Sequence, residues 1–172
     1  TIGQQPFTEG LTVTEEQPTF WGHTPRHGHL AVRMRGDVTP RSMFGAWLAG
    51  VEDRPERCGE ILLCEVFGDA IEDGSAEVGM GIRSFRDPQL TDDFAAPRLG
   101  IDVAQDHTYS VVWEPHAVEL QVDGVTVRRI EQSPDYRMQL MVGVFDFPGR
   151  DPSGAWADHV PEVVVSSVVG SP

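Results

Sequence analysis

Short runs in which apolar and polar residues alternate, separated by turn-forming residues, constrain the fold of this chain more than any other feature. The 18 glycines and 13 prolines recur at intervals of about ten residues, the spacing of turns between short strands. No segment has a long helical period of apolar residues. No run reaches the roughly 18 apolar residues of a membrane span. We therefore expect an all-β sandwich.

The strongest local signal is the dipeptide Asp123-Gly124 between two alternating runs. A type I′ turn needs a positive φ at both central residues, and Asp-Gly satisfies this, so a β-hairpin is predicted. We expect two apolar runs, 138–147 and 163–169, to be strands buried on both faces, the second tying the C-terminus into a sheet. The predicted strands are residues 29–35, 108–113, 118–122, 125–130, 138–147 and 163–169.

Length and charge limit the classes of partner. The 172 residues, 40% of them hydrophobic, are sufficient for one domain over residues 1–172 with a sizeable core. Twenty-seven acidic against 13 basic residues give a net charge of −14, which disfavours nucleic acid and anionic membranes as partners. We expect a monomer. Localisation stays open, with secretion favoured. Cys58 and Cys64 do not form a disulfide framework or a typical zinc site.

Residues 59–65 are the most informative segment, an apolar run with a carboxylate near each end. A helix over 55–68, capped by Asp53 and ended by Gly68, is one alternative. Gly59 inside such a helix costs about 1 kcal/mol relative to Ala, so a strand is favoured.

Glu60 and Glu65 point to opposite faces of a regular strand. A one-residue bulge between Leu62 and Glu65 brings both carboxylates to one face. Two carboxylates on one concave face are the groups that hydrolyse glycosidic bonds. The alternative from the residues alone is a pair of solvated carboxylates on an exposed strand.

Segment 59–65 also resembles the active-site signature of glycoside hydrolase family 16, which is Glu, any residue, Asp, one or two further residues, then Glu. The resemblance implies a concanavalin A-like β-jelly roll of two antiparallel sheets with a concave glycan groove. It also implies a retaining endo-glycosidase for a β-glucan or related polysaccharide, with Glu60 as nucleophile and Glu65 as acid/base. Further segments resemble the family in the same order: 28–35, 45–49 (a short loop similar to a cleft strand that ends in Trp-Leu), 107–115 and 122–124.

Two positions depart from the family pattern. Leu62 stands where the family has Asp, so both carboxylates lose a polar neighbour, and desolvation raises their pKa values. Hydrolysis is then slow or altered. Arg83 stands in a strand where the family often has a His beside the acid. The same fold also allows a non-hydrolytic carbohydrate-binding module, or an enzyme with a closed pocket for a small molecule.

Aromatic residues are the remaining candidates for sugar contact. Trp47 is either a platform for a sugar ring or a core residue, and Trp156 in loop 149–159 is a candidate at the border of the groove. Together with Arg83 they form the predicted substrate-binding set. Trp113 is expected in the core, and Trp21 is uninformative.

Metal and thiol chemistry have weaker support, and no cofactor is expected. An acidic loop could bind Ca²⁺ through oxygen ligands, although a solvated loop is the simpler interpretation. Its residues are Asp69, Glu72 and Asp73. Three histidines lie close together in the sequence: His23, His27 and His29. A surface loop with incidental histidines is favoured here over a metal site. Cys64 is predicted to be an inert core thiol.

Overall fold

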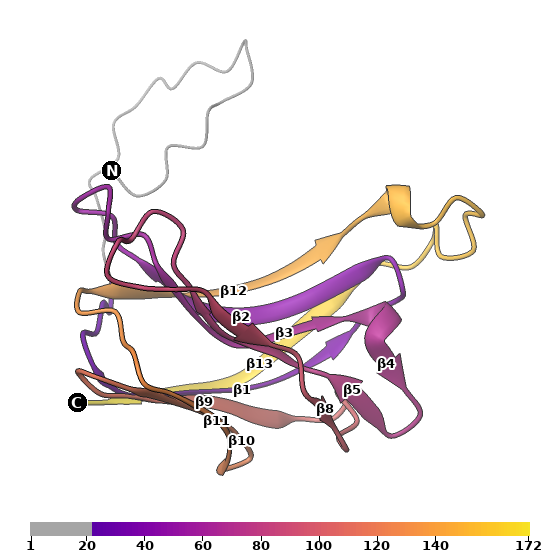
Figure 1. The fold of residues 1–172 in the computed structure, drawn as a ribbon. Helices are drawn as coiled ribbons and strands as arrows, with labels where there is room; N and C mark the ends of the chain where they lie inside the picture. The colour runs from indigo at the N-terminus through magenta and orange to yellow at the C-terminus, as the bar shows by residue number, and fades with distance from the viewer. Residues whose placement is uncertain (1–21) are drawn as a thin grey trace.

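The computed structural model describes residues 22–172, which form two five-stranded antiparallel sheets packed face to face and a small third sheet (Figure 1). The outer sheet has the order β11 (Val125–Ile130), β10 (Val118–Val122), β9 (His107–Trp113), β1 (Gly28–Asp37), β13 (Glu162–Ser171). The groove sheet has the order β12 (Met138–Asp146), β2 (Ser42–Gly50), β3 (Glu60–Phe67), β6 (Gly79–Arg83), β7 (Asp93–Ala95). The third sheet contains β4 (Ile71–Glu72), β5 (Ser75–Glu77) and β8 (Arg98–Leu99), and the two 3₁₀ turns are η1 (Gly68–Ala70) and η2 (Pro148–Arg150). The all-β jelly-roll prediction is confirmed.

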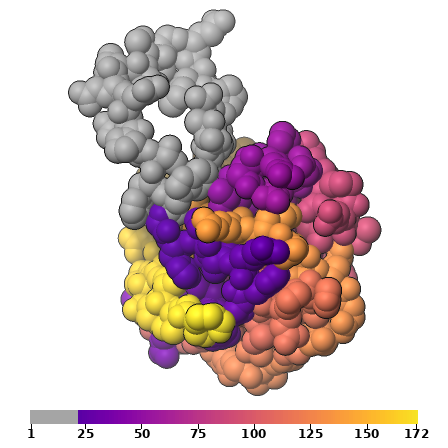
Figure 2. Space-filling view, turned by 90° about the vertical axis from the view of Figure 1, so that its left-hand side faces the viewer, coloured from indigo at the N-terminus to yellow at the C-terminus, as the bar shows by residue number. Residues whose placement is uncertain are grey.

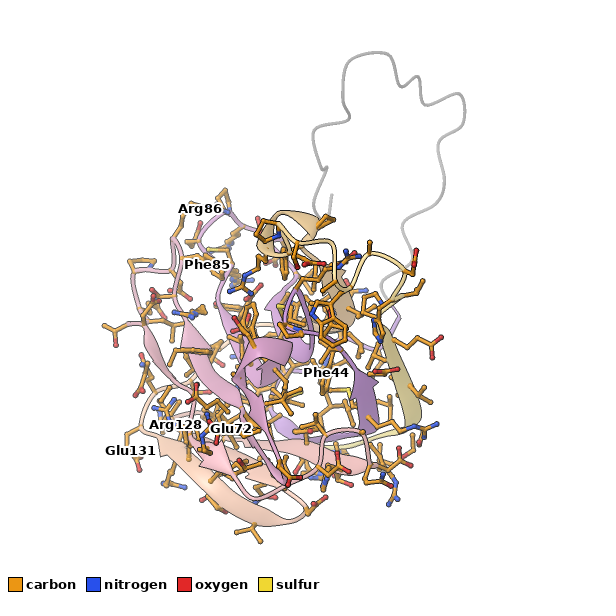
Figure 3. All side chains as sticks on the ribbon, turned by 90° about the vertical axis from the view of Figure 1, so that its right-hand side faces the viewer. Phe44, Glu72, Phe85, Arg86, Arg128 and Glu131 are labelled. Atoms are coloured by element: carbon orange, nitrogen blue, oxygen red, sulfur yellow. The ribbon has the colours of Figure 1, made fainter. Side chains whose placement is uncertain are left out.

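The core lies between the two large sheets. Alternation in β1 turns Val32 and Met34 inward, and both are fully buried. Phe44 of β2 is equally buried and is labelled near the centre of the view in Figure 3. Trp113, 2% exposed, donates its indole N–H to the Ser133 hydroxyl over 2.8 Å. The predicted core position of this tryptophan is confirmed.

The predicted hairpin joins β10 to β11. Asp123 and Gly124 have φ values of 51° and 78°, as a type I′ turn requires. The Asp123 carboxylate accepts the backbone N–H of Thr108 at 2.8 Å and lies 2.6 Å from His107 Nδ1. These residues, which carry part of the family resemblance, therefore lock the turn onto the neighbouring strand β9.

One side of the sandwich is closed by an arginine. Arg128 of β11 donates to the carbonyl oxygen of Met80 in β6 over 2.7 Å and pairs with the carboxylate of Asp93 in β7. The guanidinium thus joins the outer sheet to the groove sheet. Arg128 is labelled at the lower left of Figure 3. No helix in residues 22–172 is long and apolar enough to cross a membrane.

Two local predictions need correction, and a third is confirmed. β12 and β13 were expected to be buried on both faces, but most of β13 and half of β12 are exposed, because each strand is the edge of its sheet. The strand favoured for residues 59–65 is confirmed as β3, and residues 55–68 do not form the alternative helix. Residues 45–49 are not a loop but the middle of strand β2.

Candidate active site

A bulge in β3 sets the direction of the two glutamates. Leu62 pairs with Gly81 of β6 and Glu65 with Gly79, so three steps on β3 face two on β6. The predicted one-residue bulge is therefore confirmed. Because of this bulge, Glu60, Leu62 and Glu65 all lie on the face of the groove sheet that points away from the core. The fully buried residues of this strand are Ile61, Leu63, Cys64 and Val66.

Both glutamates line a cavity of about 400 Å³ on that face. The cavity is lined by Met43, Gly45, Trp47, Glu60, Leu62, Cys64, Glu65, Phe67, Phe145 and Phe147. Apart from the two carboxylates and one glycine, every lining residue is apolar or aromatic. The cavity therefore combines two titratable groups with surfaces on which a sugar ring can stack.

Glycines occupy the positions beside Glu65 in the groove sheet. Gly45 on β2 and Gly79 on β6 flank Glu65 in the strand register, and Gly143 of β12 lies beyond Gly45. A Cβ on Gly143 would lie 3.2 Å from the Trp47 ring. The residues that flank Glu65 in this row carry no side chains, and the rings of Phe94 and Phe145 lie over Gly79 and Gly143 instead.

Two pairs of aromatic rings border this row. Trp47 and Phe145 have ring centroids 6.2 Å apart, and Phe67 and Phe147 stack at 6.3 Å. The three phenylalanines were missed by the sequence reasoning. Phe67 lies two residues after Glu65, on the same face of a strand, and this spacing was an available signal. The other two come from β12 and the residue after it, and their approach depends on sheet order.

Burial in this apolar cavity raises the pKa of both glutamates. For Glu60 the cause is desolvation, then the charge of Glu65, with the charge of Arg83 opposing both. For Glu65 the cause is desolvation, again opposed by Arg83. The direction agrees with the expected effect of an apolar neighbour, since Leu62, 7% exposed, stands on the strand between them.

The three predicted substrate-binding residues have different positions. Trp47 lies in the cavity with the glutamates. Arg83 pairs with Glu60 in the register of β3 and β6, and its guanidinium stacks 3.9 Å above the Phe94 ring. Trp156 is 43% exposed in the loop after η2 and is not one of the residues that line the cavity. The structure therefore does not bring Trp156 together with the glutamates.

The cysteines and the acidic loop show no metal or redox arrangement in residues 22–172. Cys58 and Cys64 are free thiols, and burial raises the pKa of Cys64 far above its usual range, so this thiol is an inert core group as predicted. Asp69 and Glu72 form ion pairs with arginines. No group of three or more His, Cys, Asp or Glu in the described residues is placed to hold a metal ion. Trp21 lies outside the described residues.

The family model of glycosyl hydrolases family 16 matches residues 25–158. The chain belongs to this family. Among curated proteins, no relative matches it. Solved structures of similar fold include the GlcNAcα1-4Gal-releasing endo-β-galactosidase from Clostridium perfringens, with a TM-score of 0.72 and 21% identity over 94% of this chain and 42% of that one.

A laminarinase and one further solved protein are also similar in fold. The enzyme from Flavobacterium sp. UMI-01 has a TM-score of 0.69 and 16% identity over 87% of this chain and 69% of that one. LamA E269S from Z. galactanivorans, solved with laminaritriose and laminaritetraose, has a TM-score of 0.56 and 16% identity over 73% of this chain and 57% of that one. This family member thus spans only about two fifths of the galactosidase chain and less than two thirds of LamA.

Proposed function

We propose that this family 16 protein is a retaining endo-glycosidase acting on a β-glucan or related polysaccharide. The observation that carries the proposal is the bulge in β3, which turns Glu65 to the face of Glu60 within one aromatic cavity. Paired carboxylates on one sugar-binding face are the arrangement that double-displacement hydrolysis requires. The similar folds of the Flavobacterium laminarinase and of LamA, solved with laminaritriose and laminaritetraose, support a polysaccharide substrate.

In this mechanism Glu60 is the nucleophile and Glu65 the acid/base. The Glu60 carboxylate attacks the anomeric carbon while Glu65 gives its proton to the glycosidic oxygen, which leaves with the rest of the glycan. Water then attacks the glycosyl ester, Glu65 takes its proton, and Glu60 is released.

The electrostatics of the cavity support this division of roles. Burial keeps Glu65 protonated to higher pH than an exposed glutamate, as a proton donor needs. Once Glu65 is neutral, it no longer opposes the ionisation of Glu60, and the charge of Arg83 favours it. Arg83, across the strand register from Glu60, therefore helps to keep the nucleophile charged.

Sugar binding in this proposal depends on stacking. The Trp47 ring, tilted against Phe145 at the wall of the cavity, offers an apolar face to a pyranose ring. Arg83 remains a candidate for hydrogen bonds to sugar hydroxyls, and Trp156 for a contact with a longer glycan outside the cavity.

The test measures reducing ends released from laminarin, lichenan and galactan. We expect release from at least one of the three, and a loss of at least about a hundredfold in Glu60→Gln and in Glu65→Gln. Both variants should still bind the polysaccharide, since the aromatic walls are unchanged. Glu56→Gln, an exposed carboxylate on the loop before β3, is the matched control. Unchanged release in Glu60→Gln would contradict the proposal.

A carbohydrate-binding module of the same fold is the second candidate. The observation that favours it is Leu62, an apolar side chain in the cavity lining between two carboxyl groups that are desolvated by burial. Binding to the same polysaccharides without any release of reducing ends, undiminished in Glu60→Gln, would support this second function.

A further inference from the structure

A phenylalanine on β7 reaches across the neighbouring strand to the side of Glu65. Phe94 pairs with Gly81 of β6, which in turn pairs with Leu62 of β3. Partners directly opposite on antiparallel strands share a face, so Phe94 lies on the same face of the groove sheet as the two glutamates. Its Cζ lies 2.6 Å from the position of a Cβ on Gly79, the register partner of Glu65. The ring therefore fills the space that this glycine leaves beside Glu65.

The face of this ring carries the guanidinium of Arg83. Arg83 Cζ lies 3.9 Å from the centroid of the Phe94 ring, a distance at which a cation is attracted to an aromatic face. Arg83 pairs with Glu60 in the strand register, so its side chain starts beside one glutamate and stacks on the ring that lies beside the other. Its charge lowers the pKa of both Glu60 and Glu65, as expected of a cation close to both.

A second partner of Arg83 holds the guanidinium more weakly. Arg83 Nη1 lies 4.0 Å from the Asp92 carboxylate, and both side chains are partly exposed. Exposed ion pairs of this kind contribute little. The Asp92 carboxylate is itself held elsewhere, because it accepts the backbone N–H and the hydroxyl of Ser84, each over 2.7 Å. The ring of Phe94, rather than Asp92, therefore sets the position of the guanidinium.

Few other charges face the two glutamates within residues 22–172. From β2 and β12 the cavity is lined by uncharged side chains, and on β3 the Cys64 thiol stays neutral because burial raises its pKa. Arg150 pairs with Asp69 over 3.4 Å, and Asp93 of β7 pairs with Arg128. The stacked guanidinium is therefore the cation on which the ionisation of the two glutamates chiefly depends.

The loop that joins β6 to β7 is fixed to the rest of the molecule. Figure 2 shows residues 84–92, in rose, beside the purple loop between β2 and β3 at one end of the molecule. The backbone N–H of Arg86 donates to the Cys58 sulfur over 3.3 Å, and its guanidinium donates to the Glu52 carboxylate over 3.2 Å. The strand that carries Phe94 is thus anchored, and its ring is in position before a glycan binds.

We propose that Phe94 is a positioning residue, whose ring holds the Arg83 guanidinium beside the two glutamates and so sets the pH range of the reaction. This inference rests on the proposed function, because a nucleophile and an acid/base need opposite protonation states. Neither Phe94 nor Arg83 lines the cavity, so the ring acts through the charge that it places. Without the ring, the guanidinium is free to move toward solvent and Asp92, and both carboxyl groups then ionise only at higher pH.

The test follows the ionisation of the two carboxyl groups by carbon NMR titration of the full chain, labelled at the glutamate carboxyl carbons. Glu60→Gln and Glu65→Gln assign the two signals. We expect Phe94→Leu to move both titrations to higher pH, and Phe94→Met, a second variant without a ring, to do the same. Phe85→Leu is the matched control, because Phe85 is a 62% exposed ring in the loop after β6 (Figure 3). It should leave both titrations unchanged.

A double-mutant cycle shows whether the ring acts through the guanidinium. Arg83→Gln removes the charge and should move both titrations to higher pH by more than Phe94→Leu does. Phe94→Leu added to Arg83→Gln should then produce no further movement. In the hydrolysis assay, both limbs of the pH profile of kcat/KM should move to higher pH in Phe94→Leu.

Two results would overturn the inference. Titrations that are the same in Phe94→Leu as in the unsubstituted chain would mean that the ring does not place the charge. A further movement when Phe94→Leu is added to Arg83→Gln would mean that the ring acts through burial and not through the guanidinium. The absence of hydrolysis at every pH would contradict the proposed function alone, since the titrations need no turnover.

Discussion

Leu62 is the residue that bears most directly on whether this site hydrolyses a glycan or only binds it. It lies on the cavity face of β3 between the two glutamates, and its side chain offers no hydrogen bond to either. An apolar group there favours the neutral form of both carboxyl groups. A neutral form suits the proton donor Glu65 and opposes the nucleophile Glu60. If hydrolysis persists, position 62 limits its rate.

Leu62→Asp is therefore expected to increase hydrolysis. A carboxyl group at this position can hydrogen-bond to its neighbours and share their proton. We expect an increase of about tenfold in kcat/KM, equivalent to about 1.4 kcal/mol in activation free energy. Leu62→Asn, which hydrogen-bonds but does not titrate, should show a smaller gain. A rate that is unchanged in both variants would indicate a site remodelled for binding.

The raised pKa of Glu60 predicts how stability depends on pH. The native chain binds this proton more tightly than the unfolded chain, so stability falls as pH rises from 4.5, the ordinary value, through the folded pKa. Glu60→Gln removes the buried charge and should raise the melting temperature at pH 7. Because Glu60 is only partly buried, the expected gain is about 2 °C.

Melting curves of Glu60→Gln and the unsubstituted chain at pH 4 and pH 7 test this prediction. The difference in melting temperature between the two chains should be smaller at pH 4, because a larger fraction of Glu60 is protonated there in both the native and the unfolded state. Glu56→Gln should show no gain at either pH. A Glu60→Gln variant that is less stable at pH 7 would show that the carboxylate is stabilised in place by its partners.

At this scale the sequence predicted the two glutamates and missed most of their surroundings. Glu60, Leu62 and Glu65 lie within six residues, so one local pattern and one bulge describe them. Phe145 comes from β12, two positions away from β3 in the sheet, and Phe147 from the residue after that strand. Their approach depends on strand order, which no local pattern contains.

Strand β6 illustrates how an element supports the bulge. Gly81 pairs with Leu62 at the start of the bulge and has a φ of 149°, where residues with a side chain are strained. A Cβ there would lie 2.1 Å from the carbonyl oxygen of Asp93. Glycine at position 81 therefore allows β7 to pair closely with β6, the neighbour of the active-site strand β3.

Gly81→Ala should destabilise the chain by about 2 kcal/mol or more, since neither the φ value nor the backbone contact is easily relieved. Urea denaturation followed by tryptophan fluorescence measures the loss. Gly100→Ala is the control, because no heavy atom lies within 4 Å of its Cβ position. Similar stability of the two variants would mean that β6 and β7 separate without cost.

The strands themselves were predictable, and the burial of two of them was not. Alternation identified β1 and β10, β-branched and aromatic residues identified β9, and Asp123-Gly124 identified the hairpin of β10 and β11. The apolar runs of β12 and β13 predicted strands buried on both faces, but both strands end their sheets. A local run of valines indicates a strand, whereas the burial of that strand depends on which other strands pack against it in the fold.

For the whole molecule, the sheet order is the feature that sequence patterns could not supply. β1 pairs with β9 on one side and with β13 on the other, so strands about 80 and 135 residues apart become neighbours. The jelly-roll expectation came from the resemblance to family 16, which the family match then confirmed. Alternation alone predicted only a sandwich.

The most direct test of the central claim is to trap the sugar on the nucleophile. A laminari-oligosaccharide with 2-deoxy-2-fluoro substitution at the reacting sugar and a good leaving group should glycosylate the enzyme, with loss of the leaving group, faster than water releases the sugar. We expect peptide mass mapping to locate one glycosyl group on Glu60, and none in Glu60→Gln. A glycosyl group on Glu65, or hydrolysis of laminarin whose first product is the α-anomer, would contradict the account.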